Sequence, residues 1–293
     1  MVIKMQSILW VFPKAWRESF RQMIESKNQL QEVRVRVGSP VFLRYEGRER
    51  PLEIDKKPVI ASSDILREIV SYISNYSLYA YEEEIRQGYL TIQGGHRIGF
   101  SGQAVVENGK IKSLSYITFL NIRMAHSVEG AADNIIEQLW DKHTMKNTLI
   151  ISPPKCGKTT LLRDIVRQVS NRGLNVSVVD ERSEIAACYQ GVPQNDVGTH
   201  TDVLDGVRKS DGILMMLRAF SPEVIAVDEI GTADDTSAIH QAVYSGCSLL
   251  ATVHGESVED IYQNPNIRVL MEEGVFEKKL LLNRNRLGEV VFC

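Results

Sequence analysis

The sequence predicts an α/β protein in which a mostly parallel sheet forms the larger domain, residues 131–293, and a small α+β domain, residues 1–130, precedes it. Four near-continuous apolar runs are typical of strands that are buried on both faces of a parallel sheet. These runs span residues 148–152, 176–180, 224–228 and 248–253. Helical patterns separate them, with Gly173 and Gly246 placed where helices commonly end. A further helix is expected at residues 133–140, ahead of the first run.

The first 130 residues carry shorter patterns that predict a separate α+β domain. Residues 13–26 are expected to form a helix that begins at a proline, and Ser62 or Ser63 can cap a second helix. Between these helices, valines alternate with Arg34 and Arg36, which predicts a half-buried strand with a basic outer face. Glycine turns separate the other expected strands. Those strands span residues 41–45, 89–93, 97–106 and 115–123.

Composition excludes several classes of protein. The 293 residues are 43% hydrophobic and 24% charged, and no apolar run is long enough to span a membrane. The apolar segment at residues 8–12 is too short for a signal peptide and is stopped by Pro13. The four cysteines form no C-x-x-C pair, so we expect neither zinc nor a disulfide framework, as fits a reducing cytosol.

The net charge of −3 is unevenly distributed along the chain. Residues 1–130 carry a net charge of +4 and residues 131–293 a net charge of −7. So small an overall charge argues against general coating of nucleic acid, but it does not exclude a local basic groove. We therefore do not expect nucleic acid to be the main partner.

The segment after the first apolar run predicts a phosphate-binding loop. A strand leads into a tight loop and then into a helix, so the loop N–H groups and the helix dipole favour a polyphosphate. The sequence departs from the Walker A pattern G-x-x-x-x-G-K-[ST] at its first position, where serine replaces glycine. That serine is unfavourable only if its position requires a positive φ or a close backbone approach. The candidate nucleotide-binding residues are Ser152, Pro153, Pro154, Lys155, Cys156, Gly157, Lys158, Thr159 and Thr160.

Two residues of this loop have specific expected roles. Lys158 is expected to reach the β and γ phosphates of ATP, and the Thr159 hydroxyl to face Mg²⁺. A chance strand-turn-helix with a surface lysine is the alternative interpretation. The combination of strand, Gly-Lys-Thr and helix favours the phosphate loop.

Acidic residues at the ends of two other strands complete the candidate site. Asp228 and Glu229 follow the third run, and the carboxyl ends of parallel strands are where ligands bind. Asp228 is expected to hold Mg²⁺ through water, and Glu229 to orient or deprotonate the attacking water. Acidic pairs also simply end strands, which is the alternative.

The ends of the second and fourth runs are less specific. Glu181 lies in a charged segment that can assist Glu229 or form a solvated turn, and Arg182 can pair with carboxylates or face phosphate. His254 ends the fourth run, where it can sense the γ-phosphate or serve as an ordinary turn histidine.

These motifs, in this order, resemble the type II/type IV secretion ATPases, a hexameric branch of the RecA-like P-loop ATPases. Lys158, the segment 180–182, the segment 217–231 and the box around His254 carry the resemblance. Within that family the chain is most similar to a sporulation branch of endospore-forming bacteria, through residues 88–99, 121–123 and 180–185. The resemblance covers residues 85–293 well and residues 1–84 loosely.

The resemblance implies a fold, an activity and partners. The fold would be a RecA-like P-loop ATPase core preceded by the α+β domain, and the activity Mg²⁺-dependent ATP hydrolysis by a homo-hexamer. Glu229 would be the Walker B glutamate, Glu181 an aspartate-box carboxylate and His254 the histidine-box residue. Arg97 and Arg123 would point toward the nucleotide. The implied location is the mother-cell cytoplasm, at membrane proteins of an envelope-spanning sporulation complex whose secretion-like channel the ATPase energises.

Two other functions remain open at this point. A RecA-like ATPase acting on nucleic acid would place basic residues and aromatics along one groove. The residues named for that groove are Arg34, Arg36, Arg44, Arg48 and Arg50. A nucleotide-binding scaffold that Ser152 prevents from hydrolysing ATP is the second alternative.

The chain also departs from the family pattern. The tetracysteine zinc module of many type II members is absent and the N-terminal domain is short, and both departures indicate a minimal motor.

Overall fold

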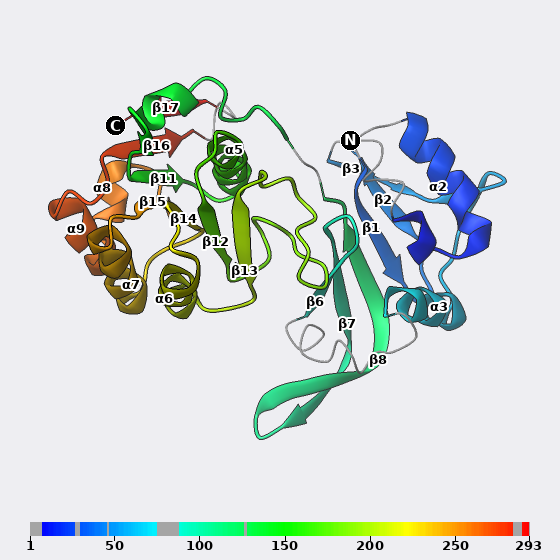
Figure 1. The fold of residues 1–293 in the computed structure, drawn as a ribbon. Coiled ribbons are helices and arrows are strands. Elements are labelled where there is room, and N and C mark those ends of the chain that lie inside the picture. Colours follow the sequence, from blue (N-terminus) through cyan, green and yellow to red (C-terminus); the bar gives the residue numbers. More distant parts are fainter. Residues whose placement is uncertain are drawn as a thin grey trace. The chain divides into compact units, whose positions relative to one another are not determined.

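The computed structural model describes residues 8–26, 30–45, 47–74, 88–125, 128–283 and 289–292. The chain divides into two compact units, Met1–His126 and Ser127–Cys293. Figure 1 shows a sheet with helices in each unit. Across the described ranges, no helix combines the length and the apolar character needed to span a bilayer.

The N-terminal unit is built on a six-stranded antiparallel sheet of order β3-β2-β1-β8-β7-β6. Its helices include α2 (Lys14–Ser26) and α3 (Ser63–Ile73), which share one apolar core with the sheet. The Ser62 hydroxyl caps α3 by accepting the Ile65 N–H at 3.2 Å. The strands are β1 (Leu30–Arg36), β2 (Phe42–Tyr45), β3 (Arg48–Pro51), β6 (Tyr89–Ile92), β7 (His96–Glu107) and β8 (Lys110–Arg123).

Alternation along β1 separates the two faces of this sheet. Val33 and Val35 are fully buried in the core, whereas Arg34 and Arg36 are only partly buried on the opposite face. The helical core therefore covers one face, and arginine side chains line the other. This agrees with the basic outer face that the sequence predicts for this strand.

The C-terminal unit is built on a seven-stranded sheet of order β13-β12-β14-β15-β11-β16-β17. All neighbouring strands are parallel except the terminal pair, β16 and β17. The strands are β11 (Thr148–Ser152), β12 (Val176–Asp180), β13 (Thr201–Asp205), β14 (Val224–Val227), β15 (Ser248–His254), β16 (Lys278–Leu282) and β17 (Val290–Phe292). The four apolar runs are thus confirmed as β11, β12, β14 and β15.

Helices pack on both faces of this sheet. Ile150 packs with residues of α5 (Lys158–Asn171), whereas Leu149 and Ile151 pack with residues of the other helices. Successive residues of β11 thus pack into two different cores, one on each face of the sheet. Both faces of the strand are buried, which explains the continuous apolar run. Figure 1 shows α5 separated by the strands from α6 and α7. Those other helices are α6 (Lys209–Phe220), α7 (Ala233–Tyr244), α8 (Val258–Ile261) and α9 (Pro265–Glu272).

The helix expected at residues 133–140 is wrong. Only the 3-10 helix η3 (Ile136–Leu139) forms there, followed by the short strand β9 (Trp140–Asp141). The reason is tertiary. Asp164 of α5, which is 2% exposed, accepts the Ala132 N–H at 2.8 Å and the Gly130 N–H at 3.3 Å. These bonds fasten the beginning of the segment to α5 in a turn, so helical pairing does not begin there.

Candidate functional site

The phosphate-loop residues join β11 to α5. Gly157 caps α5 in the left-handed region with φ 91°, and Lys155 also has a positive φ of 64°. Ser152 is not among the residues with positive φ, and its buried hydroxyl donates to the Pro153 carbonyl at 2.8 Å. The possible strain at Ser152 is therefore absent, because the loop reverses at Lys155 and Gly157 instead.

Lys158, the first residue of α5, points its ammonium group at the strand-end acids. Its Nζ donates to Glu229 Oε1 at 2.9 Å and lies 3.5 Å from Asp228 Oδ1. His254 Nε2 is also 3.5 Å from this nitrogen. Lys158 is only 6% exposed, so its ammonium group is largely shielded from water. The nearby carboxylates balance its charge there.

Thr159 and Asp228 supply oxygen atoms suited to a hard cation. The Thr159 hydroxyl donates to Asp228 Oδ2 at 2.9 Å, and the Thr252 hydroxyl donates to Asp228 Oδ1. Mg²⁺ is usually held by one or two such protein oxygens together with water and phosphate oxygens, so this pair fits Mg²⁺. A cluster of three or more His, Cys, Asp or Glu side chains that could bind a metal does not occur among the described residues.

The Glu229 carboxylate contacts three side chains of the site. Its backbone has φ 56°, and its N–H donates to Thr252 Oγ1 at 2.9 Å. Its Oε1 lies 2.6 Å from His254 Nε2, and its Oε2 accepts from Arg182 Nη1 at 3.1 Å. Partial burial favours a higher pKa for Glu229, but the hydrogen bond and charge of Lys158, with those of His254, outweigh it and lower the pKa.

The turn that follows β12 is held through both the N–H groups and the carbonyl groups of its backbone. The Asp180 carboxylate accepts the N–H groups of residues 184, 185 and 186 at 2.8–2.9 Å. Arg163 of α5 donates to the carbonyls of Glu184 and Ile185. Burial, assisted by the nearby charge of Asp205 and opposed by the backbone N–H bonds, raises the pKa of Asp180 to about 6.

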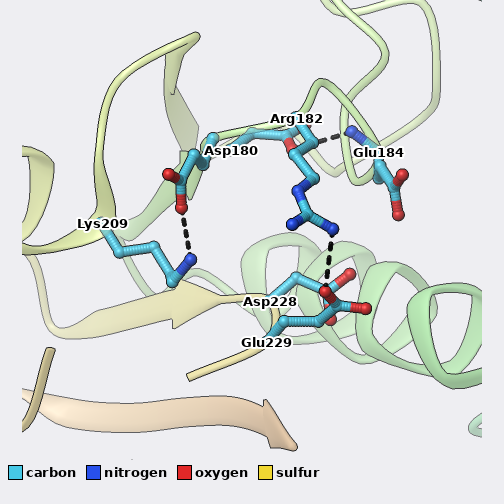
Figure 2. A pocket seen from close by; sticks show the side chains of 7 residues that line it. Asp180, Arg182, Glu184, Lys209, Asp228 and Glu229 are labelled. Atoms are coloured by element: carbon cyan, nitrogen blue, oxygen red, sulfur yellow. Dashed lines mark hydrogen bonds and ion pairs between the residues drawn. The ribbon is translucent and has the colours of Figure 1, made fainter. Parts of the chain in front are cut away.

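This turn faces the end of β14 because β12 and β14 are neighbours in the sheet. Figure 2 shows Asp180, Arg182 and Glu184 on one side of a small pocket, with Asp228 and Glu229 on the other. The pocket is lined by Asp180, Glu181, Arg182, Glu184, Lys209, Asp228 and Glu229.

Glu181 lies in this pocket, and its carboxylate pairs with Lys209. The structure thus places four predicted residues, Lys158, Asp228, Glu229 and His254, in mutual contact, and Glu181 beside them.

Three residues of the site were missed by sequence reasoning. Lys209 and Arg163 lie in ordinary helical patterns, and nothing in their spacing marks them. Thr252 does carry a signal, because it is the one polar residue in the apolar stretch 249–253. A polar residue within a strand buried on both faces requires a partner, and here the partner is Asp228.

The two predicted arginines of the N-terminal unit are neighbours on its sheet. Arg97 of β7 lies directly opposite Arg123 of β8, and Arg123 lies opposite Glu32 of β1. The Arg97 guanidinium lies over the Tyr89 ring, 4.9 Å from its centroid. Like charges opposite each other are unfavourable, and Glu32, which lies opposite Arg123 on its other side, adds a compensating acid to the same row.

The same face of the sheet carries other arginines. Arg34 and Arg44 lie 2.9 and 3.6 Å from the carboxylate of the buried Glu32, and together they lower its pKa against the effect of burial. An open concavity on the sheet is lined by Arg34, Arg36, Gly99, Phe100, Ser101, Phe119, Leu120 and Asn121.

The remaining two of the five named arginines occupy the opposite face. Arg48 and Arg50 pair with Tyr45 and Leu43, whose side chains belong to the core. The prediction of a basic groove therefore holds for Arg34 and Arg36, which line the concavity, and Arg44 lies on the same face. It is wrong for Arg48 and Arg50.

Sequence comparison identifies relatives along nearly the whole chain. The family model described as "Sporulation stage III, protein AA" matches residues 3–291. The Bacillus subtilis (strain 168) stage III sporulation protein AA is 40% identical over 286 residues, which cover 96% of this chain and 91% of that protein. The Arabidopsis thaliana protein SEEDLING PLASTID DEVELOPMENT 1 is 26% identical over 272 residues, 92% of this chain and 36% of its own length.

Solved ATPase structures have the same fold. The Legionella pneumophila ATPase DotB gives a TM-score of 0.59 at 18% identity, covering 89% of this chain and 73% of DotB. The pilus retraction motor PilT, solved with bound ADP, gives a TM-score of 0.62 at 15% identity, covering 89% of this chain and 76% of PilT. These similarities confirm the predicted fold class, an α/β core with a mostly parallel sheet preceded by a small α+β unit.

Proposed function

The chain belongs to the sporulation stage III, protein AA family, and from this premise we propose that it is an ATPase that energises a secretion-like channel assembled during sporulation. The observation that carries the proposal is the meeting of Lys158, Thr159, Asp228 and Glu229 at the carboxyl edge of the parallel sheet. This edge is where open α/β sheets bind ligands, and these four side chains are those that phosphoryl transfer requires.

ATP binding would use the loop between β11 and α5. The N–H groups of residues 155–160 and the positive end of the α5 dipole would hold the phosphates, and Lys158 would move from Glu229 onto the β and γ phosphates. Thr159 and Asp228 would hold Mg²⁺, which when bound neutralises charge on the phosphate oxygens.

Hydrolysis would use Glu229 to accept the proton of the attacking water. A glutamate carboxylate is ionised at neutral pH, as a general base requires, and the departure of Lys158 would remove the main contact that lowers the pKa of Glu229. His254 contacts the same oxygen of Glu229 as Lys158, so it can fix the carboxylate after Lys158 moves to phosphate. Glu181, paired with Lys209, is a supporting carboxylate in the same pocket.

Arg97 and Arg123 would add positive charge near the γ-phosphate to that of Lys158. They lie side by side on one sheet face of the N-terminal unit. We propose that they act when the N-terminal unit closes over nucleotide, and that a homo-hexamer enforces the closure. The relevant place is the mother-cell cytoplasm, at membrane proteins of the sporulation complex.

The decisive experiment measures phosphate release from ATP by the purified chain with and without Mg²⁺, with Lys158→Ala as control. We expect Mg²⁺-dependent release by the wild type and loss of tight ATP binding in the variant, because the strongest charge in the loop is removed. Binding without release would support a nucleotide-binding scaffold. Unchanged nucleotide affinity in Lys158→Ala would contradict the phosphate-loop assignment.

A second candidate function is an ATPase that acts on nucleic acid. The observation that favours it is the arginine-lined concavity, which also contains Phe119, a 46% exposed aromatic side chain. Stimulation of ATP hydrolysis by a single-stranded oligonucleotide, with steep loss as salt is raised, would support this function. Hydrolysis that no oligonucleotide changes favours the secretion-like motor.

A further inference from the structure

Arg182 combines a fixed backbone with an exposed side chain. The turn that carries it is held by the Asp180 carboxylate and by Arg163, which together bind the backbone of residues 184–186. The Arg182 side chain is nevertheless 68% exposed. Its guanidinium can therefore exchange one partner for another while the turn stays in place.

The present partner of Arg182 is the proposed catalytic base. Arg182 Nη1 lies 3.1 Å from Glu229 Oε2, while Lys158 and His254 occupy Oε1 at 2.9 and 2.6 Å. Both carboxylate oxygens are thus engaged by donors or cations. Lys158 and His254 thus occupy both acceptor sites of Oε1, and Arg182 occupies one of the two on Oε2, which weakens the tendency of Glu229 to take a proton from water.

The same geometry places Arg182 within reach of a bound γ-phosphate. Lys158 is expected on the β and γ phosphates, and Lys158 and Arg182 contact the two oxygens of one carboxylate group. A γ-phosphate bound beside Lys158 would therefore come close to Arg182. A guanidinium binds phosphate oxygens in pairs, which makes the exchange favourable. Figure 2 shows the Arg182 side chain directed toward Glu229 across the pocket.

We propose that Arg182 is a γ-phosphate sensor: it holds Glu229 Oε2 until a nucleoside triphosphate is bound, and then transfers to the terminal phosphate and releases the base. ADP, which has no γ-phosphate, leaves Arg182 on Glu229. The inference rests on the proposed function and adds to it a residue that couples the identity of the nucleotide to activation of the base.

The test compares affinities for two nucleotides with the full chain. We would measure dissociation constants for AMP-PNP and ADP, each with Mg²⁺, by titration calorimetry for wild type, Arg182→Ala and Arg182→Lys. Arg182→Ala should bind AMP-PNP about 10-fold more weakly, the scale of one charge-assisted hydrogen bond, and bind ADP within about 2-fold of wild type. Arg182→Lys should recover part of the AMP-PNP affinity, because the charge remains.

Arg172→Ala is the matched control, since Arg172 also forms one ion pair, with Glu137, but at the far end of α5. It should bind both nucleotides as the wild type does. In ATP hydrolysis, Arg182→Ala should raise KM by a factor close to its loss of AMP-PNP affinity while kcat changes less, because the contact with the bound triphosphate is lost and Glu229 Oε2 is no longer held in any nucleotide state.

Other outcomes overturn the sensor. Equal weakening of AMP-PNP and ADP binding would mean that Arg182 only supports the site structurally, and unchanged affinity for both would remove its phosphate contact. Failure of the proposed function is recognised separately, from the wild type alone. A wild-type chain that binds neither nucleotide contradicts the ATPase proposal, and the sensor with it.

Discussion

At the residue scale, Glu229 is the side chain on which hydrolysis should depend most. Glu229→Gln keeps the size and one acceptor oxygen but cannot take a proton at neutral pH. We expect ATP binding close to wild type and hydrolysis at least ~100-fold slower, the scale for loss of a positioned general base. Calorimetry and a phosphate-release assay would measure the two effects. Hydrolysis at the wild-type rate would instead assign the base to Glu181, in the same pocket.

Ser152 gives a second prediction at this scale. Because its backbone is outside the positive-φ region, glycine gains nothing there, and Ser152→Gly should leave kcat within about 2-fold of wild type. The lost hydroxyl bond and the greater backbone freedom should lower the free energy of unfolding by about 0.5–1 kcal/mol, measured by urea denaturation. A large loss of activity with unchanged stability would show that the hydroxyl contacts nucleotide.

Single residues also show what the sequence could reveal of the site. Asp228 and His254 were predictable because each stands at the end of a recognisable apolar strand, and Lys158 because Gly-Lys-Thr follows such a strand and opens a helix; neighbouring parallel strands end at one edge. The choice between the two interpretations of Arg182 was not predictable. Its pairing with Glu229 depends on how the turn after β12 is folded. Part of that fold comes from hydrogen bonds that the side chain of Arg163, in a different element, donates to backbone carbonyls of the turn.

At the element scale, that turn makes stability depend on pH through Asp180. Its pKa in the folded protein is raised from 3.8 to about 6, so the folded state holds this proton more tightly than the unfolded chain does. The contribution of Asp180 to the free energy of unfolding therefore grows as pH falls from about 6 toward 3.8, by up to about 3 kcal/mol.

Asp180→Asn isolates this effect, because asparagine does not titrate. The free energy of unfolding of wild type minus that of the variant should increase as the pH is lowered from about 7 to about 4, measured by urea denaturation at each pH. A difference that is flat, or that decreases on acidification, would contradict a raised pKa.

Whole elements were predictable where a local pattern was sufficient. The strands β11, β12, β14 and β15 are buried on both faces, and such strands read as continuous apolar runs. The strand β13 was missed because it lies at the edge of the sheet and is only partly buried, so its sequence lacks that run. The expected helix at residues 133–140 failed because a distant carboxylate, Asp164, accepts the N–H groups of Gly130 and Ala132 and holds the chain just before this segment in a turn.

At the scale of the whole molecule, catalysis should require both units and more than one chain. Positioned arginine can contribute about 10³-fold or more to phosphoryl transfer, and Arg97 and Arg123 belong to the unit that lacks the phosphate loop. We expect ATP hydrolysis per subunit to rise with protein concentration as a hexamer forms. Arg97→Ala and Arg123→Ala should each lower kcat more than they raise KM.

Steady-state kinetics over a range of concentrations, with light scattering on the same samples, would check this prediction. Arg67→Ala is a suitable control, because Arg67 is an exposed arginine of the same unit that is paired with Asp64 in α3. Full activity of a variant that scattering identifies as a monomer, or wild-type kinetics in both alanine variants, would refute the requirement for assembly.

Asp164 attaches α5 to the backbone of residues 130–132. Lys158 begins this helix, and Asp164 lies six residues later, about 9 Å along the helical rod. There the carboxylate accepts hydrogen bonds from the N–H groups of Gly130 and Ala132, shortly after the boundary between the two units. The helix α5 would therefore contact phosphate at its first residue, and farther along it is hydrogen-bonded to the backbone of residues 130 and 132. If α5 shifts along its axis when nucleotide binds, these two hydrogen bonds would pass the shift to the backbone of residues 130–132.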